Sequence, residues 1–555
     1  MKTNLIMLFL ILVGCSNNAK HTKDIFLDNL ISQMTLMEKI GQLNQYSSFF
    51  DVTGPAPNKG EDSLKYEQIK QGLVGSVLNV SGVEEVRAMQ KLAVENSRLK
   101  IPLIFALDVI HGYKTITPIP LAESASWNLD LIKESATMAA KEAASAGINW
   151  TFAPMVDISR DARWGRVMEG AGEDPYLASK IAVARIKGFQ GENLNDPLTI
   201  AACAKHFAAY GFAESGRDYN TVDLGYQPLH NIVLPPFKAS AEANVATFMN
   251  SFNEINGIPA TGSNYLQRDI LKGDWNYKGV MVSDWGSIGE MVPHGYSKDL
   301  KSAAKSAILA GSDMDMMSSA YINNLEALIK EKEVSIVILD DAVLRILSLK
   351  YDLGLFSDPF MYCNGDRENE NTQNARNRAI SLDIAKESIV LLKNDKKLLP
   401  LEKSGIKIAL VGALANDKDS PLGNWKANVP KNSAVSVLEG LSRGNKNVLK
   451  FESGPRLINK ETFFYEHVDI NNTDTSGTHK ALKLASKSDI VIAVLGEHGL
   501  QSGEGRSRTK INLPGLQEDF LKKIYKVNKK IILVLMNGRP LDLSWIDNKI
   551  PAVIE

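Results

Sequence analysis

The chain has 555 residues, 44% of them hydrophobic and 23% charged, and its 63 basic and 64 acidic residues leave a net charge of −1. This length exceeds what one hydrophobic core usually covers, so we expect at least two domains. The near-zero net charge gives no electrostatic basis for binding nucleic acid or an anionic membrane surface, and it favours a neutral substrate.

The N-terminal stretch MKTNLIMLFLILVGC has one lysine and an apolar run that ends at Gly14 and Cys15. The run is too short for a mature membrane-spanning helix and is typical of a signal segment. Its ending, LVGC, resembles the processing box of bacterial lipoproteins, in which the cysteine is lipidated. We therefore expect residues 1–22 to be a lipoprotein signal and tether, with lipidation at Cys15 and a lipid-anchored location in the periplasm or outer membrane. The alternative is a simple secretory signal.

From residue 24 to residue 356, eight short apolar runs alternate with amphipathic helix-like segments at a spacing of roughly 35 to 40 residues. The runs lie at 40–47, 75–80, 101–109, 148–158, 200–207, 245–253, 279–284 and 311–317. This alternation predicts an α/β fold in which residues 24–356 form a (β/α)8 TIM-like barrel. Polar residues stand at the C-terminal ends of the runs, and in a barrel those ends share one face, where active sites lie. These polar residues are Asp108, Asp157, Lys205, His206, Asn253 and Asp284.

The second half begins after a polar segment, 357–382, which reads as a linker. Apolar runs at 406–412, 488–496 and 529–538 alternate with helix-like pieces, so residues 383–555 are expected to form an α/β sandwich with a mostly parallel sheet. The final PAVIE (551–555) looks like a further buried strand with nothing after it to cover it, and we expect the domain to be C-terminally incomplete.

Two cysteines remain after Cys15, namely Cys203 and Cys363, each in a segment without a second cysteine nearby. Buried thiols fit this pattern better than a disulfide. No spacing of ligand-type residues indicates a metal site, so we expect neither a metal nor a cofactor.

The stretch GVMVSDWGSIG brings Asp284 and Trp285 out of a buried run and into a turn. Alone, Asp284 reads as a turn or cap carboxylate. Sharing a face with Asp108, Lys205 and His206, it reads as part of a site for a neutral sugar ring. Lys205 itself allows three interpretations: a solvated lysine, a Schiff-base lysine as in barrel aldolases, or a hydrogen-bond donor to hydroxyl groups. The acidic surroundings favour the third.

Two further segments follow predicted strands. The charge-rich RDARWGRVMEGAGEDP (160–175) fits either a site lining or a solvated surface. The glycine-rich GEHGLQSGEGR (496–506) lacks the phosphate-binding patterns, and Glu497 and Glu504 would repel phosphate. A mobile loop that offers a carboxylate fits it better.

Taken together, the motifs ALDVIHG, RWGR with GED, KHF, NSFNEINGIPA, GVMVSDWGSI and SGEGRSRTKINLPG resemble glycoside hydrolase family 3, in its β-glucosidase branch, over roughly residues 24–555. The resemblance implies a retaining, exo-acting β-glycosidase, most simply a β-glucosidase that releases terminal β-D-glucose from a neutral β-linked oligosaccharide or glycoside. It places the nucleophile at Asp284, the acid/base at Glu504 and the aromatic wall beside the sugar at Trp285. It also implies a set of residues that hold the sugar hydroxyls: Asp108, Arg166, Lys205, His206 and Arg217.

The chain departs from the family pattern at Phe252, where many members carry a tyrosine whose hydroxyl can bond to the nucleophile. The position lies in the substrate-binding set, but its role changes without the hydroxyl. The relatives in this branch also continue past PAVIE, which bears on the platform that holds Glu504.

Retention requires one ionised and one protonated carboxyl group about 5 to 5.5 Å apart. From the sequence we expect Lys205 and nearby arginines to favour the ionised form of Asp284, and few charges around Glu504 to leave it protonated for longer. If the loop is rearranged, Glu497 is the alternative acid/base.

Other functions remain open. Within the family these are β-xylosidase and β-N-acetylhexosaminidase, although the histidine that the latter needs does not follow KHF until His230. Outside catalysis, the chain could be a sugar-binding lipoprotein without activity, and an aldolase-like barrel using Lys205 is a further alternative.

Overall fold

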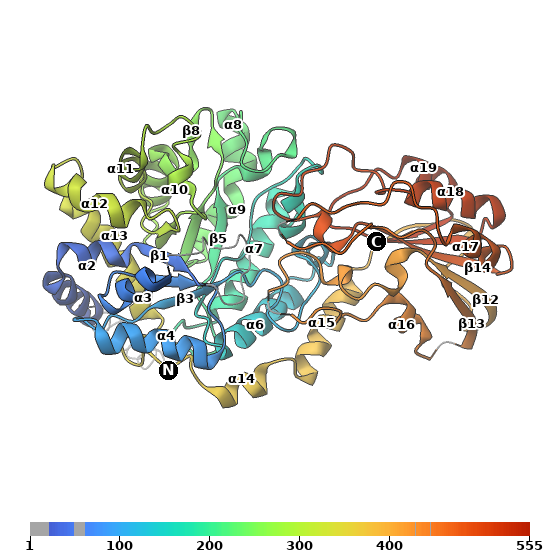
Figure 1. Cartoon of the computed structure of the whole chain (residues 1–555), viewed down its shortest axis with the longest axis horizontal. Coiled ribbons are helices and arrows are strands. Elements are labelled where there is room, and N and C mark those ends of the chain that lie inside the picture. The colour runs from blue at the N-terminus through green and yellow to red at the C-terminus, as the bar shows by residue number, and fades with distance from the viewer. Residues whose placement is uncertain (1–20, 49–61, 428, 445, 465) are drawn as a thin grey trace, which may run out of the picture.

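The computed structural model describes residues 21–48 and 62–555, apart from residues 428, 445 and 465. Cys15 and most of the expected signal and tether lie outside the described residues. Figure 1 shows two bodies side by side: a barrel, drawn from blue through green to yellow, and a sheet domain in orange and red. In the part of the chain that is described, no helix combines the length and the apolar character needed to cross a bilayer.

Eight parallel strands form a closed barrel, as the sequence predicts. They are β1 (Asn44–Ser47), β2 (Ser76–Leu78), β3 (Ile104–Leu107), β4 (Trp150–Thr151), β5 (Cys203–Phe207), β6 (Thr247–Asn250), β9 (Val280–Val282) and β10 (Asp315–Met316). Continuous pairing runs from β10 through β1, β2 and β3 to β4, and from β5 through β6 to β9. Parallel bridges Trp150 to Ala201 and Val282 to Met314 join the two groups, so the ring is complete.

Helices surround this barrel (Figure 1). The barrel half contains α2 (Leu36–Gln42), α3 (Asp62–Lys70), α4 (Val83–Asn96), α5 (Pro120–Ala125), α6 (Leu129–Ser145), α7 (Pro175–Gln190), α8 (Tyr226–Pro228), α9 (Leu234–Glu242), α10 (Ser287–Glu290), α11 (Leu300–Ala310), α12 (Ala320–Lys330) and α13 (Ile336–Asp352). Short elements on the loops are the 3-10 turn η1 (Gly165–Glu169), the π-type segments η4 (Leu229–Val233) and η6 (Tyr265–Asp274), and the hairpin β7 (Glu254–Ile255) with β8 (Ile258–Pro259). Local signals set the boundaries of several helices. At α7, for example, Asp174 caps the first turn and Pro175 occupies the first helical position.

The segment 357–382, which reads as a polar linker, is helical over much of its length. It contains α14 (Gly365–Asn371) and the first half of α15 (Ala375–Ser388). Asn364 and Asn374 cap these helices with their side chains. No residue of α14 is buried, so that helix needs no apolar face. The buried carboxylate of Glu142 on α6 accepts hydrogen bonds from Gln373 N and Asn377 Nδ2, both at 2.8 Å, and so fastens the segment to the barrel.

The second domain is built on one sheet with the strand order β11-β16-β15-β14-β12-β13. All its pairings are parallel except that of β11 with β16. The strands are β11 (Leu391–Asn394), β12 (Ser404–Val411), β13 (Lys446–Glu452), β14 (Ile490–Gly496), β15 (Ile531–Met536) and β16 (Ala552–Ile554). The helices are α16 (Val437–Ser442), α17 (Thr478–Ala485), α18 (Gln517–Val527) and α19 (Ser544–Lys549).

The expectation that PAVIE leaves an uncovered apolar edge is wrong. The strand within it, β16, pairs with β15 on one side and with β11 on the other. The covering strand comes from residues 391–394, about 160 positions earlier in the chain. The edge of the sheet on this side is therefore β11, and the sequence next to PAVIE contains no sign of that pairing.

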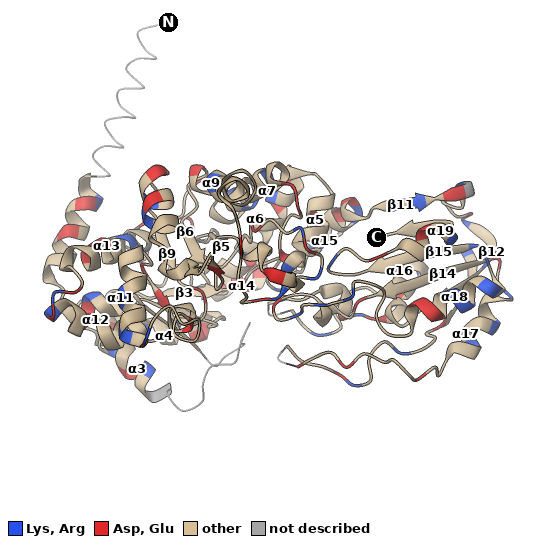
Figure 2. Ribbon diagram, turned by 90° about the horizontal axis from the view of Figure 1, so that it is seen from above, with Lys and Arg blue, Asp and Glu red and all other residues tan. Residues whose placement is uncertain are grey.

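The connections of this sheet explain how it reaches the barrel. From β12 the chain crosses to β13 on one side, and it returns to β14 on the other side, so the strand order reverses between β12 and β14. At such a switch point the loops that leave the carboxyl ends of the strands diverge and open a crevice. The loops after β12 and β14 carry Trp425 and Glu504, and both residues reach the barrel. Acidic and basic residues are interspersed over both bodies in Figure 2, in keeping with the net charge of −1.

Candidate active site

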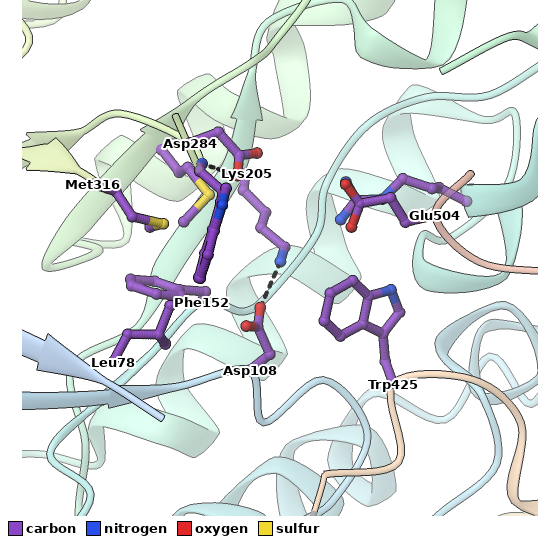
Figure 3. A pocket seen from close by; sticks show the side chains of 11 residues that line it. Leu78, Asp108, Phe152, Lys205, Asp284, Met316, Trp425 and Glu504 are labelled. Atoms are coloured by element: carbon purple, nitrogen blue, oxygen red, sulfur yellow. Dashed lines mark hydrogen bonds and ion pairs between the residues drawn. The ribbon is translucent and has the colours of Figure 1, made fainter. Parts of the chain in front are cut away.

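A cavity lies at the carboxyl ends of the barrel strands, against the second domain (Figure 3). Its lining residues are Leu78, Asp108, Phe152, Arg166, Lys205, Met249, Asp284, Trp285, Met316, Trp425 and Glu504. The barrel supplies four apolar side chains from or next to β2, β4, β6 and β10, together with most of the charged groups. The second domain supplies Trp425 and Glu504, which Figure 3 shows on the side opposite Asp284.

Asp284 follows β9 directly and is buried at the cavity wall. Its Oδ1 accepts a hydrogen bond from the backbone N–H of Trp285 at 2.7 Å, which fixes the carboxylate plane. Its Oδ2 lies 3.5 Å from His206 Nε2 and has no hydrogen-bond partner among the described residues. One buried carboxylate oxygen is thus held in position while the other is left available.

The expected charge state of Asp284 is corrected by the structure. Burial raises the pKa of Asp284 to about 8, and the Glu504 charge adds to this, while Arg166 and Lys205 oppose it only in part. The neighbouring cations are visible in the sequence, but burial is not. Burial has the larger effect on the pKa of Asp284.

His206 stands behind Asp284 and does not line the cavity. Its Nδ1 lies 2.8 Å from Asp157 Oδ2. Burial, together with the Arg166 and Lys205 charges, holds the pKa of His206 well below its usual range, so the ring is neutral. A neutral ring bonded through Nδ1–H to Asp157 presents an acceptor at Nε2 toward Asp284. His206 Nε2 can therefore accept a hydrogen bond from Asp284 only when that carboxyl group is protonated, and at 3.5 Å the two atoms form no hydrogen bond here.

Asp108 and Lys205 face each other across the cavity wall. Lys205 Nζ donates to Asp108 Oδ1 at 3.0 Å (Figure 3). Burial has the largest single effect and lowers the pKa of Lys205, but the charges of Asp108, Glu169 and Asp284 together outweigh it, so the pKa is raised. A Schiff-base lysine needs a neutral amine, so this protonated lysine does not suit the aldolase interpretation. The pair instead offers adjacent donors and acceptors, as a ring of hydroxyl groups requires.

Glu504 has more charged neighbours than the sequence indicates. Arg166 on η1 holds Glu169 in a bidentate pair at 2.8 and 2.9 Å, and its Nη1 lies 3.8 Å from Glu504 Oε1. The expectation of few charges near Glu504 is therefore wrong. The reason is that Glu504 and Arg166 are brought together only when the two domains dock.

The docking is close enough to require glycine. A Cβ on Gly165 would lie 2.2 Å from the carbonyl oxygen of Gly503, so no other residue fits without moving the loop that carries Glu504. The backbone N–H of Gly503 donates to the carbonyl of Gly165 at 2.7 Å, and that of Arg508 to the carbonyl of Arg163 at 3.0 Å.

Besides His206, three residues named from the sequence do not line the cavity. Arg217 is exposed, and its side chain has no contact to the cavity residues in the described structure. Phe252 is buried beneath the site in an aromatic cluster with Trp164 and Tyr210. Glu497, the alternative acid/base, is bound by Arg508 at 2.6 Å and Arg539 at 3.0 Å and holds the base of the Glu504 loop.

Two residues near the centre of the site are absent from the sequence interpretation. Trp425 donates its indole N–H to Glu169 Oε1 at 2.9 Å, and its ring lies 5.5 Å from Lys205 Nζ. Tyr219 donates to Glu504 Oε1 at 2.6 Å. The signal for Trp425 was an aromatic residue in the loop after the predicted strand 406–412. For Tyr219 the contact partner lies 285 positions away, and no local signal exists.

Comparisons with known proteins agree with this architecture. The family model described as "Glycosyl hydrolase family 3 N terminal domain" matches residues 35–349. The model described as "Glycosyl hydrolase family 3 C-terminal domain" matches residues 389–555. A periplasmic beta-glucosidase of Salmonella typhimurium is 39% identical over 96% of this chain and 70% of its own length. A beta-xylosidase of Formosa agariphila is 31% identical over 94% and 74%.

Among solved structures, a beta-glucosidase from Listeria innocua in complex with isofagomine superposes with a TM-score of 0.88 at 38% identity. The match covers 95% of this chain and 71% of that protein. The two family descriptions cover both halves of the molecule, and the cavity lies where those halves meet. The chain belongs to glycosyl hydrolase family 3.

Proposed function

We propose that the chain is a retaining, exo-acting β-glucosidase in which Asp284 is the nucleophile and Glu504 the acid/base. The observation that carries this proposal is that two carboxyl groups, from separate domains, line one cavity. A concave site with an apolar floor suits the terminal ring of a glycan, which supports exo action.

The reaction proceeds by double displacement. Asp284 Oδ2 attacks the anomeric carbon while Glu504 gives its proton to the glycosidic oxygen, and the bond to the leaving group breaks. Water then attacks the anomeric carbon of the glycosyl-enzyme. Glu504, now ionised, takes a proton from this water, and the Asp284 carboxylate is released. The Trp285 N–H bond keeps the attacking carboxylate oriented in both steps.

The remaining cavity groups suit a neutral sugar. Asp108, Lys205 and Arg166 provide charged acceptors and donors for hydroxyl groups, whose hydrogen bonds to charged partners are stronger than neutral ones. Trp285 and Trp425 add aromatic surface. Relatives support glucose as this sugar, because the Listeria innocua beta-glucosidase was also solved in complexes with glucose and with laminaribiose.

A β-xylosidase activity is the second candidate, favoured by the similarity to the Formosa agariphila beta-xylosidase. Glucose and xylose differ by the exocyclic hydroxymethyl group. The preference between glucosides and xylosides therefore depends on whether the cavity floor around Leu78, Phe152 and Met316 accepts that group.

A panel of 4-nitrophenyl glycosides tests the assignment. We expect kcat/KM to be highest for the β-glucoside. It should be lower for the β-xyloside by about 10-fold or more, since an extra buried group contributes about 1 to 3 kcal/mol. It should be negligible for the β-N-acetylglucosaminide and the α-glucoside. Proton NMR during turnover should show β-glucose as the first product. Binding of these sugars without turnover would instead support the non-catalytic lipoprotein, and a first product in the α form would contradict retention.

We also infer a lipid anchor at Cys15, supported by the LVGC box and by the periplasmic location in the name of a relative. A Cys15→Ser variant, expressed in a bacterial host with lipoprotein processing, should move the protein from the membrane pellet to the soluble fraction, because a lipidated cysteine is what holds it there. A Cys203→Ser variant is the matched control. Equal partition of both variants and the wild type would contradict the anchor.

A further inference from the structure

We propose that Tyr219 is a positioning residue for the acid/base: its phenolic hydroxyl, held by the barrel, fixes Glu504 of the second domain for proton transfer. The inference rests on the function proposed above and deepens it. It assigns to the 214–219 loop a task in the reaction rather than in sugar binding.

The contact has the geometry of a strong hydrogen bond. Tyr219 Oη lies 2.6 Å from Glu504 Oε1, within the range of a hydroxyl bound to a carboxylate. The Arg166 guanidinium approaches the same oxygen at 3.8 Å. Since both contacts are made to Oε1, Oε2 is the oxygen left to exchange the proton with the substrate.

The neighbouring residue strengthens the arrangement. Asp218, which is buried, accepts the backbone N–H of Gly505 on one carboxylate oxygen and the indole N–H of Trp164 on the other, each at 2.5 Å. Two consecutive barrel residues, Asp218 and Tyr219, thus bond to two consecutive residues of the second domain, Glu504 and Gly505. This four-residue junction sets the position of the acid/base relative to the barrel, and hence relative to Asp284.

The phenol ring is packed on one side, although the residue is 40% exposed. Phe252 packs edge-on against it with ring centroids 5.0 Å apart at 89°. Tyr219 also has a φ of 66°, a backbone conformation that is strained for a non-glycine residue and that persists where the surroundings enforce it. The packing suggests why a phenylalanine suffices at position 252, where many family members have a tyrosine. Its ring supports the phenol of Tyr219, which bonds to Glu504.

The chemistry needs a donor that does not lose its own proton. Burial and the nearby Glu504 and Asp218 charges raise the pKa of Tyr219, so the phenol remains protonated through both steps. It can donate to Oε1 while Oε2–H protonates the leaving group. It continues to donate when Glu504 is an anion awaiting the proton from water.

The test exploits leaving-group ability with one sugar. In Tyr219→Phe, kcat/KM for phenyl β-D-glucoside should fall by about 10- to 100-fold, a part of the 10²- to 10⁴-fold that general acid catalysis contributes. For 2,4-dinitrophenyl β-D-glucoside, whose leaving group needs no proton, kcat/KM should stay within about threefold of wild type. On that substrate kcat and KM should fall together, because loss of the base slows hydrolysis of the glycosyl-enzyme.

Tyr265→Phe is the matched control, since its hydroxyl bonds to His230 in a surface contact, at 2.9 Å. Both substrates should then be turned over as in wild type. In a Glu504→Ala background, Tyr219→Phe should have no further effect if it acts through Glu504, because coupled residues are non-additive.

Equal losses on both substrates, or an additive loss in the Glu504→Ala background, would overturn the assignment and leave Tyr219 with a structural role. Unchanged kinetics on both substrates would overturn it as well. Neither result would affect the proposed function, which is tested separately by turnover of the glucosides by the wild-type chain and by the anomeric form of the first product.

Discussion

An Asp284→Asn variant should lose kcat/KM for an activated aryl β-glucoside by on the order of 10⁴- to 10⁶-fold, as expected for removal of a nucleophile. The same variant should be more stable than the wild type at pH 7. Both effects have one physical origin: a carboxyl group that the reaction needs as an anion is largely buried at the cavity wall.

The sign of the stability effect follows from linkage. The pKa of Asp284 is raised in the folded state to about 8, from an ordinary value of 3.8. The folded protein therefore binds this proton more tightly than the unfolded chain does, and the free energy of unfolding falls as the pH rises from about 4 to about 8. At pH 7 the wild type loses up to about 4 kcal/mol through this group, and asparagine removes the loss.

Thermal unfolding of the two proteins from pH 4 to pH 8 measures the effect. The melting temperatures should converge near pH 4 and diverge as the pH rises, with the variant higher. Asp161→Asn is a control of opposite sign, because the hydrogen bond from Arg163 holds the pKa of Asp161 below its ordinary value. That substitution should not stabilise the chain at any pH. Parallel melting curves for Asp284→Asn and wild type would contradict the raised pKa.

The same ionisation should appear in the kinetics. With 2,4-dinitrophenyl β-D-glucoside, which needs no acid, kcat/KM of the wild type should rise with pH along a limb well above the ordinary 3.8 of an aspartate. An acid limb at or below that value would mean that the free enzyme keeps Asp284 ionised.

The barrel was predictable because its strands are buried on both faces and so appear as short continuous apolar runs. The same property revealed β12, β14 and β15. By contrast, β13 alternates half-buried and exposed residues at a sheet edge, and β11 is largely exposed, so neither has an apolar run to detect. The pairing of β11 with β16 joins distant segments, and no local pattern indicates such a partner.

The site residues likewise fall into those that the sequence predicts and those that it does not. Asp108, Lys205 and Asp284 could be predicted from the sequence because each stands at the end of a barrel strand. Polar residues at those ends all face the same side of the barrel. Glu504 came from the family resemblance. Tyr219 and Trp425 were missed because their roles exist only in contacts between the domains. The charge state of Asp284 was mistaken because burial is a property of the folded surroundings.

Arg166 is the residue whose replacement should damage stability most among the cavity charges. Its bidentate pair with Glu169 is buried on both sides, with side-chain exposures of 2% and 0%. Arg166→Gln leaves the Glu169 carboxylate buried without its cation, at a cost of about 3 to 5 kcal/mol in the free energy of unfolding. Activity should fall as well, by about 10²- to 10³-fold, as for the removal of other preorganised charges.

A second substitution separates these two losses. In the double variant Arg166→Gln/Glu169→Gln, the buried charge is gone, and the glutamine oxygen can still accept the indole N–H of Trp425, which Glu169 now accepts at 2.9 Å. Most of the stability in urea unfolding should therefore return. Activity should not return, because the guanidinium 3.8 Å from Glu504 remains absent. If kcat/KM recovered together with stability, Arg166 would serve only to neutralise Glu169, and the cation next to the acid/base would have no part in the reaction.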